Sequence, residues 1–187
     1  MAVKLIASDL DGTLLTNKKE LSPRTREALD LAAAQGIYLV PATGRSFESV
    51  PEMIREYPGV EYLITANGGA VYSVSEKKRI YQCLMTPESV EAAIAVRKRE
   101  KMVMEVVIDG VPYAEEDYVR DPHSYLATEY GARYIKATRT PVKDIIEFAT
   151  QHAKELDSIS FVCSHEDRNR LYASLEDEIP DIYVTSS

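Results

Sequence analysis

The chain has 187 residues, of which 45% are hydrophobic and 28% are charged, a composition typical of a folded globular protein. Its formal net charge of −8 argues against nucleic acid as the main partner, because binding to a phosphate backbone needs a basic surface. The sequence contains no apolar segment of membrane-spanning length and no signal-peptide layout, which predicts a cytoplasmic protein without membrane contact. Cys83 and Cys163 lie in apolar runs and are expected to be buried free thiols.

The first part of the chain alternates predicted strands and helices. Apolar runs predict three strands, over residues 3–8, 37–42 and 61–66. Two helices are predicted between them, over residues 21–36 and 46–59, with Ser22 and Ser46 as candidate N-caps. This alternation with short links favours an α/β fold with a parallel, right-handed sheet. The near-continuous apolar strands favour a sheet that is covered on both faces, so that residues 3–8 form a buried strand.

After Asn67 the pattern changes from α/β to α+β. Residues 68–85 predict a β-hairpin, and residues 102–115 predict a second one around an Asp109-Gly110 turn. Further helices are predicted over residues 86–101, 142–154 and 166–177, and further strands over 158–163 and 182–185. We therefore expect two domains, residues 1–84 and residues 85–187.

Polar, loop-forming residues follow each of the three predicted parallel strands. They are Asp9, Asp11 and Gly12 after the first strand, Thr43, Gly44 and Arg45 after the second, and Asn67 after the third. Because ligands of parallel sheets bind outside the carboxyl ends of the strands, these residues form a candidate site at one edge. Taken singly, Thr43 and Asn67 are better explained as turn residues.

Asp9 and Asp11 are harder to explain as turn residues. Two carboxylates one residue apart repel each other, and an unpaired charge at the end of a buried strand is unfavourable. Alternation along the chain points both side chains to the same side, and a bound divalent cation is a usual way to hold such a pair together. The spacing of acidic residues does not match a calcium-binding EF-hand loop, and the glycine-rich nucleotide-binding motifs are absent.

Three short motifs resemble the haloacid dehalogenase superfamily of phosphohydrolases. They are "DLDGTL" at residues 9–14, "ATGR" at 42–45 and "TANGGAVY" at 65–72, and they are most similar to the Cof-type branch. Members of that branch act mostly on sugar phosphates and other small phosphate monoesters. The resemblance implies that residues 1–84 form the N-terminal part of a Rossmann-like core, and that residues 85–187 form an inserted α+β cap domain.

The resemblance also implies roles for the candidate site residues. Asp9 would be the nucleophile that forms an aspartyl phosphate, and Asp11 would be the general acid and then the general base. Mg²⁺ would be held by Asp9 and Asp11, with Asp11 contributing its backbone carbonyl. The phosphate and substrate would be bound by Gly12, Thr43, Gly44, Arg45 and Asn67, with a small phosphorylated metabolite as the partner.

Two further motifs of the family, a lysine at the start of a helix and an acidic pair after a fourth strand, have no match in the sequence. The resemblance therefore implies the first half of the core plus the cap, without the positive charge that stabilises the aspartyl phosphate. We expect an exposed sheet edge, exposed apolar faces and weak or no activity for this chain alone. A phosphomutase and a non-catalytic phosphate-binding module are the alternative functions. In the cap, Tyr113, Tyr118, Tyr125 and His123 are candidates for pocket lining or for packing.

Overall fold

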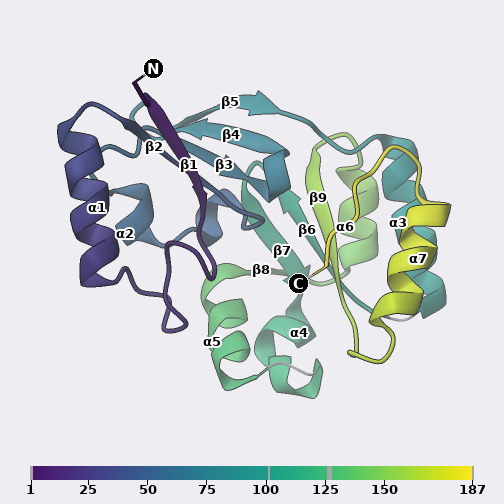
Figure 1. The fold of residues 1–187 in the computed structure, drawn as a ribbon. Coiled ribbons are helices and arrows are strands. Elements are labelled where there is room, and N and C mark those ends of the chain that lie inside the picture. The colour runs from purple at the N-terminus through teal and green to yellow at the C-terminus, as the bar shows by residue number, and fades with distance from the viewer. Residues whose placement is uncertain (1, 101, 126–127, 187) are drawn as a thin grey trace. The chain divides into compact units, whose positions relative to one another are not determined.

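A computed structural model describes residues 2–100, 102–125 and 128–186 of the chain (Figure 1). The chain divides into two compact units, Met1–Cys83 and Leu84–Ser187. Among the described residues, no helix is both long enough and apolar enough to cross a membrane.

The first unit contains a five-stranded sheet in the order β1-β2-β3-β4-β5. The strands are β1 (Leu5–Asp9), β2 (Tyr38–Ala42), β3 (Tyr62–Thr65), β4 (Ala70–Ser73) and β5 (Lys78–Gln82). The first three run parallel, and β4 and β5 are antiparallel to their neighbours, as the predicted hairpin requires. This confirms a mixed α/β fold whose parallel part is formed by the predicted strands.

Helices α1 (Pro23–Ala34) and α2 (Glu52–Arg55) pack on one face of this sheet. Helix α1 begins as predicted, because the Ser22 side chain accepts a hydrogen bond from Thr25 N at 3.0 Å. The second helix is shorter than predicted. A 3-10 turn over Phe47–Ser49 precedes α2, and Pro51 separates the two, because a proline supplies no N–H to continue a helix.

Strand β1 is exposed rather than buried, which corrects the prediction. It lies at the end of the strand order, and Leu5 and Ile6 are 52% and 39% exposed. On the helix-covered face Leu39 and Leu63 are buried, whereas Tyr38, which pairs with Leu5, is 45% exposed on the other face. Leu5 and Tyr38 are thus exposed on the face opposite the helices, which agrees with the expected exposed edge and exposed apolar surface.

The second unit contains a four-stranded sheet in the order β8-β7-β6-β9. The strands are β6 (Val103–Ile108), β7 (Val111–Glu115), β8 (Thr140–Val142) and β9 (Leu156–Val162). The predicted turn between β6 and β7 forms, with positive φ angles of 47° at Asp109 and 77° at Gly110. Strand β8 runs parallel to β7, and the other pairs are antiparallel.

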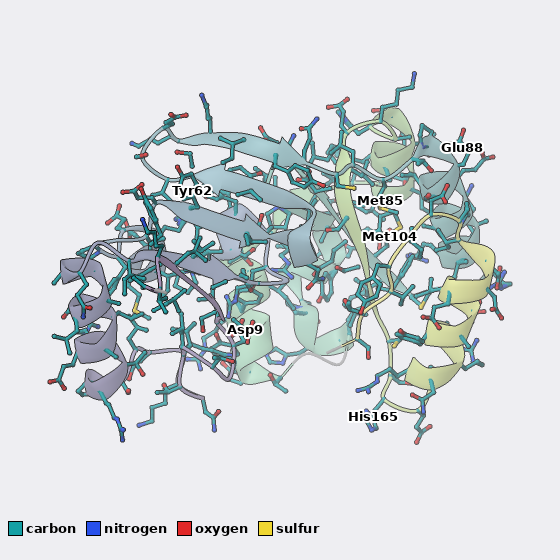
Figure 2. The ribbon with its side chains drawn as sticks, turned by 45° about the horizontal axis from the view of Figure 1, so that its top comes forward. Asp9, Tyr62, Met85, Glu88, Met104 and His165 are labelled. Atoms are coloured by element: carbon teal, nitrogen blue, oxygen red, sulfur yellow. The ribbon has the colours of Figure 1, made fainter. Side chains whose placement is uncertain are left out.

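Within the described residues of this unit, five helices accompany the sheet. They are α3 (Pro87–Glu100), α4 (Glu116–Arg120), α5 (Glu129–Thr138), α6 (Ile145–Gln151) and α7 (Arg168–Glu178), with a 3-10 turn over Pro122–Tyr125. Met104 of β6, labelled in Figure 2, is fully buried in a cluster with residues of α3 and α6. Helices α4 and α5 and strand β8 were not predicted from the sequence.

Two other predictions, the strand over 182–185 and the burial of Cys83 and Cys163, are wrong. Residues 182–186 form no strand, so the predicted strand over 182–185 is absent from the described residues. Cys83 is exposed and Cys163 is only partly buried, although both are free thiols as expected. An apolar sequence neighbourhood does not decide burial when the strand lies at the edge of a sheet, as β5 does.

Candidate active site

Asp9 is the last residue of β1, and the chain turns sharply after it (Figure 2). The turn is closed by a hydrogen bond of 2.8 Å from Leu15 N to the carbonyl of Leu10, whose side chain is fully buried. The Thr13 hydroxyl donates to Asp9 Oδ2 at 3.2 Å, and the Asp9 carboxylate is otherwise exposed. Gly12 has a φ of +85°, a conformation that glycine adopts without steric strain. A Cβ at Gly12 would meet no atom within 4 Å, so the space beside it is open.

The Asp11 carboxylate is held by two cations. Arg45 Nε donates to Asp11 Oδ2 at 2.7 Å, and Arg45 Nη2 donates to Asp11 Oδ1 at 2.9 Å. Lys19 Nζ reaches the same Oδ1 at 2.6 Å. The hydrogen bonds from Arg45, aided by those from Lys19, lower the pKa of Asp11 to about 2 against the opposing effect of partial burial. Asp11 is therefore a carboxylate at neutral pH.

The ends of β2 and β3 are joined by backbone hydrogen bonds. Asn67 N donates to the carbonyl of Thr43 at 3.2 Å, and Ala66 N donates to that of Arg45 at 3.0 Å. The buried Thr43 hydroxyl accepts from Arg45 N at 3.2 Å. A Cβ at Gly44 would lie 2.7 Å from Asn67 Oδ1, so the glycine leaves room for the asparagine side chain. Thr43 and Asn67 thus act as turn residues and also bring two strand ends together.

The structure brings the predicted site residues together through two links. Arg45 joins the loop after β1 to the end of β2, and Thr43 with Asn67 joins β2 to β3. Asp9 reaches the site as the last residue of β1, and its side chain accepts a hydrogen bond from the Thr13 hydroxyl. The predicted set therefore lies at the carboxyl ends of three neighbouring parallel strands, as expected.

Lys19 is the site residue that the sequence analysis missed. It lies in a hairpin turn in which Thr16 N donates to Glu20 O at 2.9 Å and Lys19 N donates to Thr16 O at 2.8 Å. The flanking leucines Leu15 and Leu21 pair across this hairpin and are buried. Two leucines that bracket a short polar segment are the signal that could have indicated a hairpin folding back on the site.

The two cations change the electrostatic argument made from the sequence. The Asp9–Asp11 pair was expected to need a metal ion, and the chain was expected to lack the positive charge that stabilises the aspartyl phosphate. Arg45 and Lys19 supply two positive charges within 2.9 Å of Asp11. Asp9 also lies on an exposed strand, where water screens its charge. The repulsion between the two carboxylates is therefore already compensated by the protein.

The two carboxylates differ in how well they suit a magnesium ion. Both oxygens of Asp11 accept hydrogen bonds from cationic side chains, whereas the Asp9 carboxylate is exposed. Over residues 2–100, 102–125 and 128–186, no group of three His, Cys, Asp or Glu side chains could hold a metal ion. Mg²⁺ commonly uses one or two carboxylates and takes its other ligands from phosphate and water. Asp9 fits that role, while the Asp11 side chain in this arrangement does not.

In the second unit, the candidate pocket tyrosines serve packing. Tyr118 is 3% exposed, and its ring contacts Tyr125 edge-on with 5.5 Å between centroids. Burial and the nearby Glu105 charge raise the pKa of Tyr118 above its usual range. Tyr113 packs against Phe148. His123 lies 3.4 Å from Glu129 on an exposed segment.

Comparison with known proteins identifies what the chain resembles. The family model of the haloacid dehalogenase-like hydrolases matches residues 6–187. The HMP-PP phosphatase of Klebsiella pneumoniae is 27% identical over 178 residues, which are 95% of this chain and 61% of that protein. A pyridoxal phosphate phosphatase of Escherichia coli is 26% identical over 174 residues, 91% of this chain and 62% of that protein.

A solved structure agrees with these relatives. The crystal structure of a haloacid dehalogenase-like hydrolase from Bacteroides thetaiotaomicron superposes with a TM-score of 0.71 at 25% identity, over 93% of this chain and 63% of that one. The chain thus spans about three fifths of the length of each of these three proteins.

Proposed function

Because the chain belongs to the haloacid dehalogenase-like hydrolase family, we propose that it carries the nucleophilic site of a magnesium-dependent phosphatase of small phosphate monoesters. One observation carries the proposal. An exposed carboxylate, that of Asp9, ends β1 two residues before Asp11, whose carboxylate is held by two hydrogen bonds from Arg45 at the next strand end. Two neighbouring carboxylates in such different environments suit two different chemical roles.

In this proposal Asp9 is the nucleophile. One of its carboxylate oxygens attacks the phosphorus atom, the bond between phosphorus and the leaving alcohol oxygen breaks, and an aspartyl phosphate forms. The Thr13 hydroxyl, which donates to Asp9 Oδ2, leaves Oδ1 for the attack. A bound Mg²⁺ would reduce the repulsion between this carboxylate and the phosphate.

Asp11 is the proton-transfer group. It gives a proton to the leaving alcohol and later takes one from the water that hydrolyses the aspartyl phosphate. Arg45 fixes its orientation through two hydrogen bonds and favours the carboxylate, which is the form needed for the second step. The first step needs the protonated form, so the combined hold of Arg45 and Lys19 on Asp11 must weaken when substrate binds, for example by a shift of Lys19 away from Asp11.

Backbone and side-chain groups at the ends of β2 and β3 bind the phosphate in this proposal. Thr43, Gly44 and Asn67 lie at the joined strand ends, and Gly12 leaves open space beside the Asp9 loop. Residues 85–187 act as the cap domain. The names of the two relatives, which act on HMP-PP and on pyridoxal phosphate, support small phosphorylated metabolites as the substrate class. Sugar phosphates and a cytoplasmic location stay predictions.

The proposal is tested with p-nitrophenyl phosphate and Mg²⁺ on the 187-residue chain and on its Asp9→Asn variant. We expect slow turnover that Asp9→Asn abolishes, together with a phosphorylated form of the chain that mass spectrometry assigns to Asp9. Turnover that survives Asp9→Asn contradicts the assignment of the nucleophile. Product analysis with a sugar phosphate separates a phosphatase, which releases inorganic phosphate, from a phosphomutase, which isomerises the sugar phosphate.

A non-catalytic phosphate-binding module is the second candidate. The hold of Arg45 and Lys19 on both oxygens of Asp11 favours it, because this hold opposes the protonated form. Binding of phosphate without any turnover, even after prolonged incubation with Mg²⁺, would support this second candidate over the first.

A further inference from the structure

Lys19 places an additional positive charge at the site, on the same Asp11 oxygen that Arg45 contacts. The Lys19 Nζ to Asp11 Oδ1 distance is 2.6 Å, and the Arg45 Nη2 to Asp11 Oδ1 distance is 2.9 Å. One carboxylate therefore faces two cations. The group formed by these three side chains has a formal charge of +1, which offsets the negative charge of the neighbouring Asp9 and so reduces the repulsion that an incoming anion meets.

The position of this ammonium group is set by a well-anchored hairpin. Leu15 and Leu21, at its two ends, are 2% and 6% exposed, and backbone hydrogen bonds of 2.8 and 2.9 Å close the turn between them. Lys19 itself has a φ of +62°, a left-handed conformation that side-chain-bearing residues seldom adopt. The local backbone thus directs Lys19 to Asp11 instead of leaving the side chain on a free loop.

Lys19 and Arg45 differ in their capacity to bind a further ligand. Arg45 uses Nε and Nη2 on Asp11 and Nη1 on the Ser49 carbonyl, and its side chain is only 13% exposed. Lys19 has three donor hydrogens, its contact with Asp11 uses one, and its side chain is 30% exposed. Arg45 is therefore suited to hold Asp11, whereas Lys19 can donate to a second acceptor that arrives from solvent.

We propose that Lys19 is a phosphate-binding residue of this site, whose ammonium contacts an oxygen of the bound phosphate while Arg45 stays on Asp11. This inference rests on the proposed function, because it takes the phosphate group of that same site as its ligand. Hydrogen bonds between ammonium and phosphate are charge-assisted and are among the strong ones in proteins. Lys19 thereby supplies positive charge that the motifs of the sequence did not indicate.

The test measures the affinity of the 187-residue chain for inorganic phosphate in the presence of Mg²⁺ by isothermal titration calorimetry. We expect Lys19→Met to weaken phosphate binding about tenfold or more, and Lys19→Arg to retain most of the affinity. Lys18→Met is the matched control, because Lys18 is an exposed neighbour in the same loop and its loss changes the net charge equally. We expect Lys18→Met to change the affinity by less than about twofold.

A second variant should change the affinity for phosphate in the direction opposite to Lys19→Met. Asp11→Asn removes the carboxylate that Lys19 and Arg45 neutralise, so the two cations attract phosphate more strongly and binding should tighten by about threefold or more. Circular dichroism checks that each variant is folded. If Lys19→Met does not fold, the phosphate affinities of wild type, Lys19→Arg and Asp11→Asn still test the inference. In that comparison, unchanged or weaker binding by Asp11→Asn overturns the inference.

The outcomes separate this inference from the proposed function. Equal phosphate affinities for wild type and Lys19→Met overturn the inference, even where Asp9→Asn abolishes turnover and the proposed function stands. Weakened binding by Lys19→Met without turnover by any form supports the inference, while the catalytic proposal fails. Wild-type chain that binds no phosphate at millimolar concentrations also overturns the inference.

Discussion

Replacing Arg139 by methionine should destabilise the unit Leu84–Ser187 by about 3–5 kcal/mol, because it leaves the buried carboxylate of Glu105 without its cationic partner. Arg139 Nη2 and Nε donate to Glu105 Oε2 and Oε1 at 2.7 and 3.1 Å. The two side chains are only 14% and 8% exposed. Burial opposes the charged form of Arg139, but the hydrogen bonds and charge of Glu105 outweigh it and raise the pKa of Arg139 further above its usual range.

The size of this loss in the free energy of unfolding depends on which charges remain buried in the variant. After Arg139→Met, Glu105 in the middle of β6 keeps its charge with no cation in contact, or takes up a proton at a similar cost. The lost contacts with the Tyr134 ring, at 4.8 Å, and with the Thr138 hydroxyl, at 2.8 Å, add to this. The double variant Glu105→Leu/Arg139→Met removes both charges and should be at least about 2 kcal/mol more stable than Arg139→Met alone.

Urea denaturation followed by far-UV circular dichroism measures these free energies of unfolding. The two units can unfold in separate transitions. The transition whose midpoint urea concentration shifts in Arg139→Met is assigned to the second unit. Arg120→Met is the matched control, since Arg120 pairs with Asp117 on the surface of the same unit at 73% exposure. It should cost no more than about 0.5–1 kcal/mol. Equal losses in the free energy of unfolding for Arg139→Met and Arg120→Met would show that burial of the Arg139–Glu105 pair does not set the size of the effect.

Three further predictions concern the first unit. Ser22→Ala should lower its free energy of unfolding by about 1 kcal/mol, measured by urea denaturation, since the N-cap bond to Thr25 N is lost; a loss below about 0.2 kcal/mol would contradict this. Arg45→Met should raise the pKa of Asp11 from about 2 toward its ordinary 3.8, as read from the carboxyl ¹³C shift during a pH titration. In the wild type, the stability that this lowered pKa contributes is present above about pH 4 and is lost as the pH falls toward 2. Burial, with the hydrogen bond to Asp30, raises the pKa of Tyr57 from 10.0 to about 12, so its contribution to stability is present below pH 10 and is lost as the pH rises toward 12. Wild type should therefore lose more stability than Tyr57→Phe between pH 9 and about pH 11.5, and equal losses would contradict the assignment.

Local features of the fold were predictable from the sequence because neighbouring residues decide them. Ser22 caps α1, and the Asp109-Gly110 turn forms between β6 and β7, since each depends on a few adjacent residues. The error at Pro51 is of the same local kind. One helix was predicted over 46–59 with Ser46 as its candidate N-cap, but the missing N–H of Pro51 divides that segment.

The candidate site was predictable only in part. The polar residues after three parallel strands were found because the alternation of strands and helices places the carboxyl ends at one edge. The partners of Asp11 were not found, because Arg45 is 34 residues away and Lys19 reaches it only through the hairpin between Leu15 and Leu21. The two leucines could have indicated the hairpin, but nothing in residue spacing indicates that Lys19 contacts Asp11.

The sequence by itself determined the alternation of strands and helices in the first unit, the parallel pairing of β1 to β3 and the family, because these depend on residue spacing along the chain. Only the tertiary structure decided that β1 lies at an exposed edge and that Asp11 is neutralised by two cations. Exposure depends on which strand lies beside which, and electrostatic energy depends on distances in space. Residue spacing in the sequence specifies neither of these quantities.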